Sequence, residues 1–354
     1  AIDLTIVCMD DPLVGGLVDA LEAEGLRAFG PRKNAAILEG SKAFSKDLMK
    51  KYNIPTAAYE NFDNAEDAIK YLKEQASFPI VLKADGLALG KGVVIAQNES
   101  EAFDAIASIM EDKIFGESGS QIVIEEFLTG PEVSVLSFTD GKTVKPMVSS
   151  MDHKRALDGD QGLNTGGMGT VAPNPYYTPE IAQQCMDTIF LPTIRAMQEE
   201  GRPFTGCLYF GLMLTPNGPK VIEYNCRFGD PETQVVLPLL KTDLVDIMLA
   251  IWEGKLDECS IEWKDGCAAC VVMASGGYPK KYATGLPISG LDENGQVANC
   301  FVYHAGTKLD GDTILTAGGR VLGVTATADT LPNALQTAYD GVKSIAFQDA
   351  HYRN

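Results

Sequence analysis

Apolar positions along the chain switch between the spacing of strands and the spacing of helices, which predicts a mixed α/β protein. At the start, residues 2–7 predict a strand, a helix then ends near residue 24, and residues 26–30 predict a second strand. This strand–helix–strand order is typical of a parallel α/β unit. Because residue 1 falls directly on a strand, we expect the given sequence to begin inside a domain.

The next segment predicts helices and an apolar hairpin. One helix follows Lys42 and ends before Pro55. The other elements are a helix over 65–74, strands over 78–83 and 93–96, a helix over 99–110 and a strand over 122–128.

A glycine-rich loop joins the two strands of this hairpin. It contains Gly86, Gly90, Lys91 and Gly92, and Lys83 ends the strand before it. Glycines let backbone N–H groups approach an anion, and the lysines add positive charge. Because no Ser or Thr follows Lys91, the loop is not a P-loop. It is a candidate phosphate site, with a solvated hairpin loop as the alternative.

The second half of the chain predicts hairpins, helices and then a change of pattern. Strands are expected over 133–138, 144–148, 206–214 and 219–226, and helices over 178–199, 233–240 and 243–253. After residue 267 the strands become short, at 267–273, 299–304, 313–315 and 319–326, and a helix covers 331–345. This last region predicts a separate small α+β domain.

The strand over 219–226 carries the most informative polar side chains. Alternate side chains of a strand share a face, so Glu223 and Asn225 are expected to point the same way. A carboxylate and an amide oxygen suit a hard cation such as Mg²⁺. Arg227 follows and can hold a carboxylate or phosphate through two hydrogen bonds. A solvated glutamate and a structural pair of Arg227 with Asp230 are the alternative.

Three further stretches are candidate binding segments. The end of the strand at 126–128 exposes backbone groups that can read an adenine edge, and Glu132 can bind ribose hydroxyls. Residues 152–155, Asp-His-Lys-Arg, form a charged cluster, and residues 164–169, Asn-Thr-Gly-Gly-Met-Gly, form a second glycine-rich loop. An ordinary strand end and solvated loops are the alternatives.

Composition narrows the class of protein. At 354 residues, with 45% hydrophobic residues, the chain is globular and long enough for two or three domains. The net charge of −19 argues against a nucleic-acid-binding surface. The eight cysteines are scattered, and Cys267 and Cys270 lie in an apolar run that predicts a reduced core strand rather than a metal site. No apolar run is long enough for a membrane helix, so we expect a cytoplasmic protein without membrane contact.

The order of these motifs closely resembles the glycinamide ribonucleotide synthetase family of the ATP-grasp superfamily, over essentially the whole chain. The resemblance rests above all on residues 164–169 and 225–234, which read Asn-Thr-Gly-Gly-Met-Gly and Asn-Cys-Arg-Phe-Gly-Asp-Pro-Glu-Thr-Gln. It implies an ATP-grasp fold with a partial N-terminal parallel α/β domain and a small C-terminal α+β domain. The implied boundaries are 1–38 for the N-terminal domain, 39–59 with 128–264 for the central domain, 60–127 for its lid, and 265–354 for the C-terminal domain.

The resemblance also implies roles for individual residues. The expected ATP-binding residues are Lys42, Lys83, Gly90, Lys91, Gly92, Glu125, Glu126, Phe127, Leu128 and Glu132. Glu223 and Asn225 are expected to bind Mg²⁺ or Mn²⁺. The expected substrate-binding residues are Asp152, Lys154, Arg155, Asn164, Thr165, Gly166, Gly167, Arg227, Gly229 and Asp230. Among all of these, Arg227, Lys83 and Asp230 are expected to be catalytic.

The implied reaction joins glycine to 5-phosphoribosylamine, with ATP as the third substrate, and the implied enzyme is a monomer. Many family members open with a strand and a glycine-rich loop that this sequence lacks, so we expect a fragment or the ordered portion of a longer chain. Many also have Gly-Pro-Glu-Ala-Pro-Leu where this chain reads Cys8-Met-Asp-Asp-Pro-Leu13. Two alternatives remain: another ATP-grasp carboxylate ligase, and a nucleotide-binding fragment without turnover.

Overall fold

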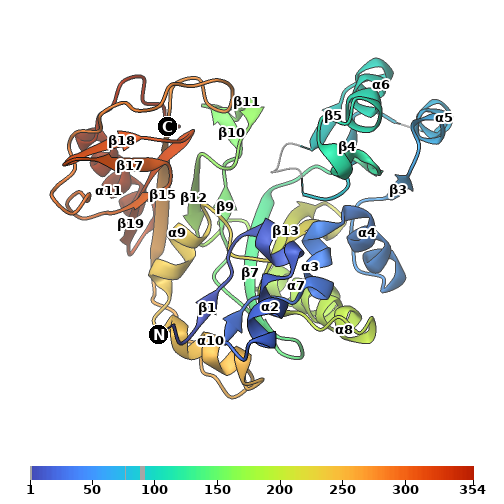
Figure 1. Cartoon of the computed structure of the whole chain (residues 1–354), viewed down its shortest axis with the longest axis horizontal. Helices are drawn as coiled ribbons and strands as arrows, with labels where there is room; N and C mark the ends of the chain where they lie inside the picture. The colour runs from blue at the N-terminus through green and yellow to red at the C-terminus, as the bar shows by residue number, and fades with distance from the viewer. Residues whose placement is uncertain (1, 76, 88–91) are drawn as a thin grey trace. The chain divides into compact units, whose positions relative to one another are not determined.

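The computed structural model describes residues 2–75, 77–87 and 92–354 (Figure 1). By packing, the chain divides into two compact units. The first contains the residues up to Pro146, Thr178–Phe228 and Val245–Cys259. The second contains Met147–Tyr177, Gly229–Leu244 and Ser260–Asn354.

The first unit begins with the predicted strand–helix–strand segment. Strands β1 (Thr5–Ile6) and β2 (Ala28–Phe29) pair in parallel. The predicted helix between them is two helices, α1 (Asp10–Gly15) and α2 (Leu17–Ala23), because Gly16 has a φ of 94° that interrupts the helix. Helix α3 (Lys33–Gly40) was not predicted, whereas α4 (Lys42–Lys51) was. In the structure Ser41 is the N-cap of α4.

An antiparallel sheet, here named the lid sheet, contains the predicted apolar hairpin. Its order is β3 (Tyr59–Phe62), β6 (Ile122–Glu126), β4 (Ile80–Ala84) and β5 (Val93–Ala96). Helices α5 (Ala65–Gln75) and α6 (Glu99–Ile106) pack on it, and a π-helical turn continues α6 over Ala107–Glu111. Strand β3 was missed, because its sequence Tyr-Glu-Asn-Phe has no clear apolar alternation.

A second antiparallel sheet, the central sheet, carries the most informative strand. Its order is β14 (Gly218–Asn225), β13 (Thr205–Thr215), β7 (Glu132–Asp140) and β8 (Val144–Pro146). The predicted hairpin of β13 and β14 is confirmed. The predicted helix after Thr178 consists of α7 (Pro179–Cys185), a π-helical turn over Met186–Phe190 and α8 (Leu191–Glu199). Phe190 packs on Phe210 of β13 with ring centroids 4.4 Å apart, which fixes this helical segment against the sheet. Helix α10 (Leu244–Trp252) lies almost wholly in this unit.

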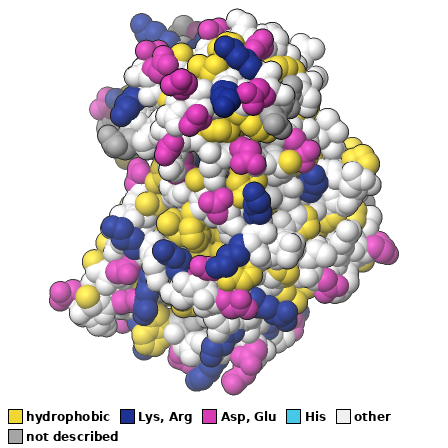
Figure 2. Space-filling model, turned by 90° about the vertical axis from the view of Figure 1, so that its right-hand side faces the viewer, with side chains coloured by type: hydrophobic (Ala, Val, Ile, Leu, Met, Phe, Trp, Pro, Cys, Tyr) yellow, Lys and Arg dark blue, Asp and Glu magenta, His cyan; other side chains and the backbone are white. Residues whose placement is uncertain are grey.

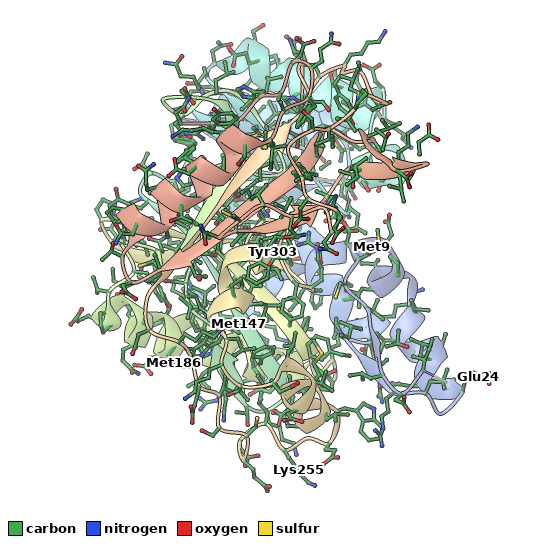
Figure 3. The ribbon with its side chains drawn as sticks, turned by 90° about the vertical axis from the view of Figure 1, so that its left-hand side faces the viewer. Met9, Glu24, Met147, Met186, Lys255 and Tyr303 are labelled. Carbon is green, nitrogen blue, oxygen red and sulfur yellow. The ribbon has the colours of Figure 1, made fainter. Side chains whose placement is uncertain are left out.

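The second unit is built on one five-stranded antiparallel sheet. The strands are β16 (Phe301–His304), β19 (Arg320–Ala328), β15 (Cys267–Ala274), β12 (Gly169–Ala172) and β9 (Met151–Asp152), in that order. Helix α11 (Leu331–Ser344) lies along this sheet (Figure 3), and its buried Ala338 and Val342 pack into the core. The sheet joins segments on both sides of residue 264, where a domain boundary was expected; the boundaries themselves stay a prediction.

Smaller elements complete this unit. Two hairpins pair β10 (Arg155–Leu157) with β11 (Gln161–Asn164), and β17 (Thr307–Asp310) with β18 (Thr313–Thr316). Helix α9 (Thr233–Val236) precedes a 3-10 turn over Leu237–Leu239. Cys270 is buried in β15 and Cys267 is half-buried, and both are free thiols, as expected of a core strand.

Among the described residues, none of the helices is long and apolar enough to cross a membrane. Figure 2 shows acidic and basic side chains interspersed over the face that it draws, without a continuous basic area.

Candidate active site

A buried group of three charges lies where the lid sheet meets helix α4. One carboxylate oxygen of Glu125 in β6 forms an ion pair with Lys46 Nζ at 3.0 Å. The other oxygen pairs with Nζ of Lys83 in β4 at 3.1 Å. All three side chains are at most 6% exposed. Burying an unpaired charge costs several kcal/mol, so Glu125 is what allows two lysines to stay buried. We name Lys46, Lys83 and Glu125 the Glu125 cluster.

The Glu125 cluster also reaches the central sheet. Lys83 Nζ donates a hydrogen bond to the Ile222 carbonyl of β14 at 3.1 Å. Lys46 Nζ donates to Thr56 Oγ1, and that hydroxyl donates to the Val221 carbonyl, both at 2.7 Å. The cluster therefore ties the lid sheet to the strand that carries Glu223 and Asn225. Burial lowers the pKa of Lys46 to about 8, although the Glu125 carboxylate opposes the shift.

The start of helix α4 holds the loop that leaves β4. Lys42 Nζ donates to the Gly86 carbonyl at 2.7 Å. Asp85 accepts hydrogen bonds from the Ser41 hydroxyl and from the Ala43 N–H. Burial lowers the pKa of Lys42, whereas the charge of Glu223 raises it. The charges of Lys42 and the candidate metal ligand Glu223 therefore interact.

A second buried acid lies at the end of β14. Glu39, 8% exposed, accepts a hydrogen bond from the Cys226 N–H at 2.6 Å and pairs with Arg227 at 3.1 Å. Arg227 also donates to Asn225 Oδ1 at 3.5 Å. Burial raises the pKa of Glu39, and Arg227 opposes that shift. Glu39 thus holds Arg227 beside the candidate metal ligand Asn225.

The other predicted ATP-binding residues follow β6 or lie in the glycine-rich loop. Glu126 accepts hydrogen bonds from Lys220 at 2.7 Å and from the Ala58 N–H at 3.0 Å. Phe127 is 39% exposed, Leu128 is half-buried, and Glu132 opens β7 opposite Met213. Gly92 is buried just before β5. Gly90 and Lys91 lie outside the described residues.

The predicted substrate-binding residues of the second unit form another group. Thr165 Oγ1 donates to the Lys154 carbonyl at 2.8 Å and accepts from the Gly167 N–H at 3.0 Å. Gly167 has a φ of +112°, and a Cβ there would lie 2.5 Å from Asp152 Oδ1. Only glycine fits this position without displacing its neighbour. The absence of a side chain at Gly167 thereby lets the loop of residues 164–167 approach Asp152 closely.

Asp230 joins the same group through Arg320 of β19. Arg320 Nη1 donates to the Gly166 carbonyl at 2.7 Å and to the Asp230 carbonyl at 2.9 Å. Arg320 Nη2 pairs with the Asp230 carboxylate at 3.2 Å. Gly229 accepts a hydrogen bond from the Thr233 N–H at 3.1 Å. Arg155 donates to the Gly162 carbonyl at 2.8 Å, within its own hairpin.

Sequence reasoning missed Glu39, Lys46 and Arg320. Lys46 could have been found, because it lies one helical turn after Lys42 on a predicted helix. Glu39 lies three residues before Lys42, but its burial depends on the packing of α3 against β14. Arg320 had no local signal, since its partners Gly166 and Asp230 are 154 and 90 residues away in the sequence.

An antiparallel lid sheet tied by buried lysines to a strand bearing an acid and an amide defines the class of this protein as ATP-grasp. Family models agree: phosphoribosylglycinamide synthetase N domain at residues 1–39, ATP-grasp (A) domain at 40–233 and C domain at 268–354. The chain belongs to the phosphoribosylglycinamide synthetase family. The resemblance and fold class predicted from the sequence are confirmed.

Individual relatives agree with the family. A phosphoribosylamine–glycine ligase of Clostridium acetobutylicum is 50% identical over 99% of this chain and 83% of its own length. One from Salmonella typhimurium is 51% identical over 100% of this chain and 82% of its own length. The crystal structure of a phosphoribosylamine–glycine ligase from Thermotoga maritima matches with a TM-score of 0.84 and 34% identity, covering 92% of this chain and 81% of that one. A biotin carboxylase from Campylobacter jejuni, with a TM-score of 0.77 and 15% identity over 99% of this chain and 76% of that one, shares the fold alone.

Proposed function

We propose that this protein is an ATP-dependent ligase that joins glycine to 5-phosphoribosylamine and gives glycinamide ribonucleotide, ADP and phosphate in purine biosynthesis. Family membership and relatives about 50% identical over the whole chain support this activity. The observation that carries the proposal is the Glu125 cluster, in which buried Lys83 of β4 donates a hydrogen bond to the Ile222 carbonyl of β14, the strand that carries Glu223 and Asn225. A carboxyphosphate-forming ligase is less well supported, because the biotin carboxylase likeness extends to the fold alone.

The chemistry requires two steps because a carboxylate is a poor electrophile. A glycine carboxylate oxygen attacks the γ-phosphorus of ATP, the bond to the β-phosphate oxygen breaks, and ADP leaves. The amine of 5-phosphoribosylamine then attacks the carbonyl carbon of glycyl phosphate. Phosphate leaves and the nitrogen loses a proton. No enzyme nucleophile takes part, so the protein acts by positioning its substrates and neutralising charge.

In this mechanism Lys42 and Lys83 neutralise the phosphates of ATP. Both lysines are anchored in the structure by carbonyl groups, of Gly86 and Ile222 respectively, so little reorganisation is needed when an anion binds. The segment from Glu125 to Leu128 would contact adenine, and Glu132 the ribose. The glycine-rich loop with Gly90, Lys91 and Gly92 would cover the phosphates.

Glu223 and Asn225 would hold a divalent cation, Mg²⁺ or Mn²⁺. The donor set fits this group: both are oxygen donors on β14, both half-buried, and Glu223 lies within electrostatic reach of Lys42. Among the described residues no group of three or more His, Cys, Asp or Glu could hold a metal. Two protein ligands are enough for Mg²⁺, because this ion usually takes its other oxygen ligands from water and from substrate phosphates. When bound, the cation would supply positive charge beside the transferring phosphoryl group.

The second unit would bind the other substrates. In this unit the proposed glycine-binding residues are Asn164, Thr165, Gly166, Gly167, Gly229 and Asp230, and Asp152, Lys154 and Arg155 would line the acceptor site. Arg227 of the first unit is also proposed as a substrate-binding residue. Arg227, Lys83 and Asp230 would be the catalytic residues. We further propose a monomeric enzyme of the cytoplasm.

The decisive measurement is ADP release with Mg-ATP, glycine and freshly generated 5-phosphoribosylamine, omitting each component in turn. Release that requires all three would support the ligase. ATP binding without release on any carboxylate would instead support the nucleotide-binding fragment. Release stimulated by bicarbonate but not by glycine would favour the carboxyphosphate-forming class.

A further inference from the structure

Arg320 of the C-terminal strand β19 contacts two of the predicted glycine-binding segments. Its guanidinium makes hydrogen bonds to two carbonyls, those of Gly166 and Asp230, and an ion pair to the Asp230 carboxylate. The two partners come from segments 64 residues apart in the sequence. A planar guanidinium with several N–H donors is suited to join a carbonyl and a carboxylate in one fixed geometry.

The backbone around Arg320 is shaped for this contact. A Cβ at Gly166 would lie 2.9 Å from Arg320 Cζ and 3.0 Å from its Nη2, so the absence of a side chain at Gly166 lets the guanidinium lie this close to the loop. The side chain of Arg320 is 21% exposed, whereas that of Asp230 is 54% exposed. The arginine is therefore the less exposed partner of the pair, and Asp230 is the more accessible one.

Tyr278 provides a second attachment from the same part of the chain. Its hydroxyl accepts a hydrogen bond from the Gly166 N–H at 3.1 Å. Gly166 thus has its carbonyl bound by Arg320 and its N–H bound by Tyr278. Tyr282 packs beside Tyr278, with ring centroids 6.2 Å apart, and offers a control at an adjacent ring.

We propose that Arg320 and Tyr278 are positioning residues, which hold Gly166 and Asp230 in the arrangement that the glycine substrate requires. This inference rests on the proposed function, since it assumes that residues 164–167 and 230 bind glycine. The two side chains act on the substrate through these segments, without touching it. Their effect is therefore specific to glycine and does not extend to ATP.

The test compares Arg320→Lys and Tyr278→Phe with Tyr282→Phe as the matched control. Lysine keeps the positive charge of Arg320 but cannot make the same set of hydrogen bonds. We expect kcat/KM for glycine to fall about 10- to 100-fold in Arg320→Lys, as for other losses of substrate alignment. Tyr278→Phe loses one hydrogen bond and should lower it about three- to tenfold. In both variants KM for ATP should change less than about twofold, and Tyr282→Phe should behave as the wild type.

Hydrogen–deuterium exchange provides a readout that does not depend on turnover. The backbone of residues 164–168 should exchange faster in Arg320→Lys and Tyr278→Phe, while strand β13 keeps its protection. Unchanged exchange in this segment together with unchanged KM for glycine would overturn the inference. Equal increases in KM for glycine and ATP would also overturn it, because they would indicate a general structural role. If the wild type itself shows no glycine-dependent ADP release, the proposed function fails, and the exchange data still decide whether the two residues hold the loop.

Discussion

The two groups of residues around the predicted site residues are held in opposite ways. In the first unit, the three charged side chains of the Glu125 cluster are each at most 6% exposed. A fourth buried charge, that of Glu39, lies beside Arg227. In the second unit, Gly166 and Asp230 are held mainly through backbone carbonyls by one arginine, and the Asp230 side chain is 54% exposed.

The difference corresponds to the ligands proposed for each group. A polyanion such as ATP is bound by positive charge. In a buried, low-dielectric environment each lysine interacts more strongly with an anion, but it must be paired with an acid to stay buried. A small substrate such as glycine needs precise placement, which backbone groups held by glycine-rich turns can provide. Mutations in the first group should therefore affect charge and stability, and mutations in the second group should affect alignment.

The largest effect is expected at Glu223, the proposed metal ligand of the first group. Glu223→Ala should lower Mg²⁺-dependent ADP release about 100- to 1,000-fold or more, because the charge stabilisation of phosphoryl transfer is lost. Folding should be largely intact, since Glu223 is half-buried. Steady-state assays over a range of Mg²⁺ concentrations, with exposed Glu180→Ala as control, provide the measurement. Full activity in Glu223→Ala would remove the metal assignment.

The next largest effect concerns the stability of the Glu125 cluster. Glu125→Ala leaves two lysines buried without their carboxylate and should lower the free energy of unfolding by about 3–5 kcal/mol. Its neighbour Glu126, with a side chain 43% exposed, pairs with Lys220, so Glu126→Ala should cost less than about 1 kcal/mol. Urea unfolding of both variants measures the contrast. Equal losses at the two positions would break the distinction between buried and exposed charges.

A smaller effect is expected at Gly167 in the second group. Gly167→Ala forces a Cβ to within 2.5 Å of Asp152 Oδ1 at a φ of +112°, a strain of about 1–3 kcal/mol. The loop should shift, so KM for glycine should rise while KM for ATP stays near the wild-type value. Gly159→Ala is the control, because its φ is also positive but no atom lies within 4 Å of the added Cβ. The alignment role of this loop would be refuted by equal kinetics in the two variants.

The most gradual effect, small at any one pH step, is a dependence of stability on pH from Lys46. Burial lowers its pKa to about 8, so between pH 8 and the ordinary lysine pKa of 10.5 the unfolded chain binds the proton that the folded chain has released. Stability from this group therefore rises with pH in that window, by at most about 1.4 kcal/mol per pH unit. Urea unfolding from pH 7 to 10 should show that the free energy of unfolding of the wild type rises with pH relative to that of Lys46→Met. A constant difference would mean that Lys46 keeps its proton.

The sequence alone determined most of the elements around both groups. The hairpins of β4 with β5 and of β13 with β14, the cap at Thr178 and the β15 core strand follow from local apolar spacing and turn residues. The same local patterns indicated Lys83, Glu223, Arg227 and the loop over 164–169 as candidate site residues. These features are readable because they depend on neighbours a few positions away.

Only the tertiary structure decided which side chains meet. Glu125 binds Lys83 because β4 and β6 are adjacent strands, and it binds Lys46 because α4 packs at their junction. Glu39 reaches Arg227 across 188 positions, and Arg320 reaches Gly166 across 154. Such contacts follow from the crossing of distant segments, for which a single sequence carries no periodic signal. The sequence therefore specified the chemical groups, whereas packing determined which of them are buried, paired and held in place.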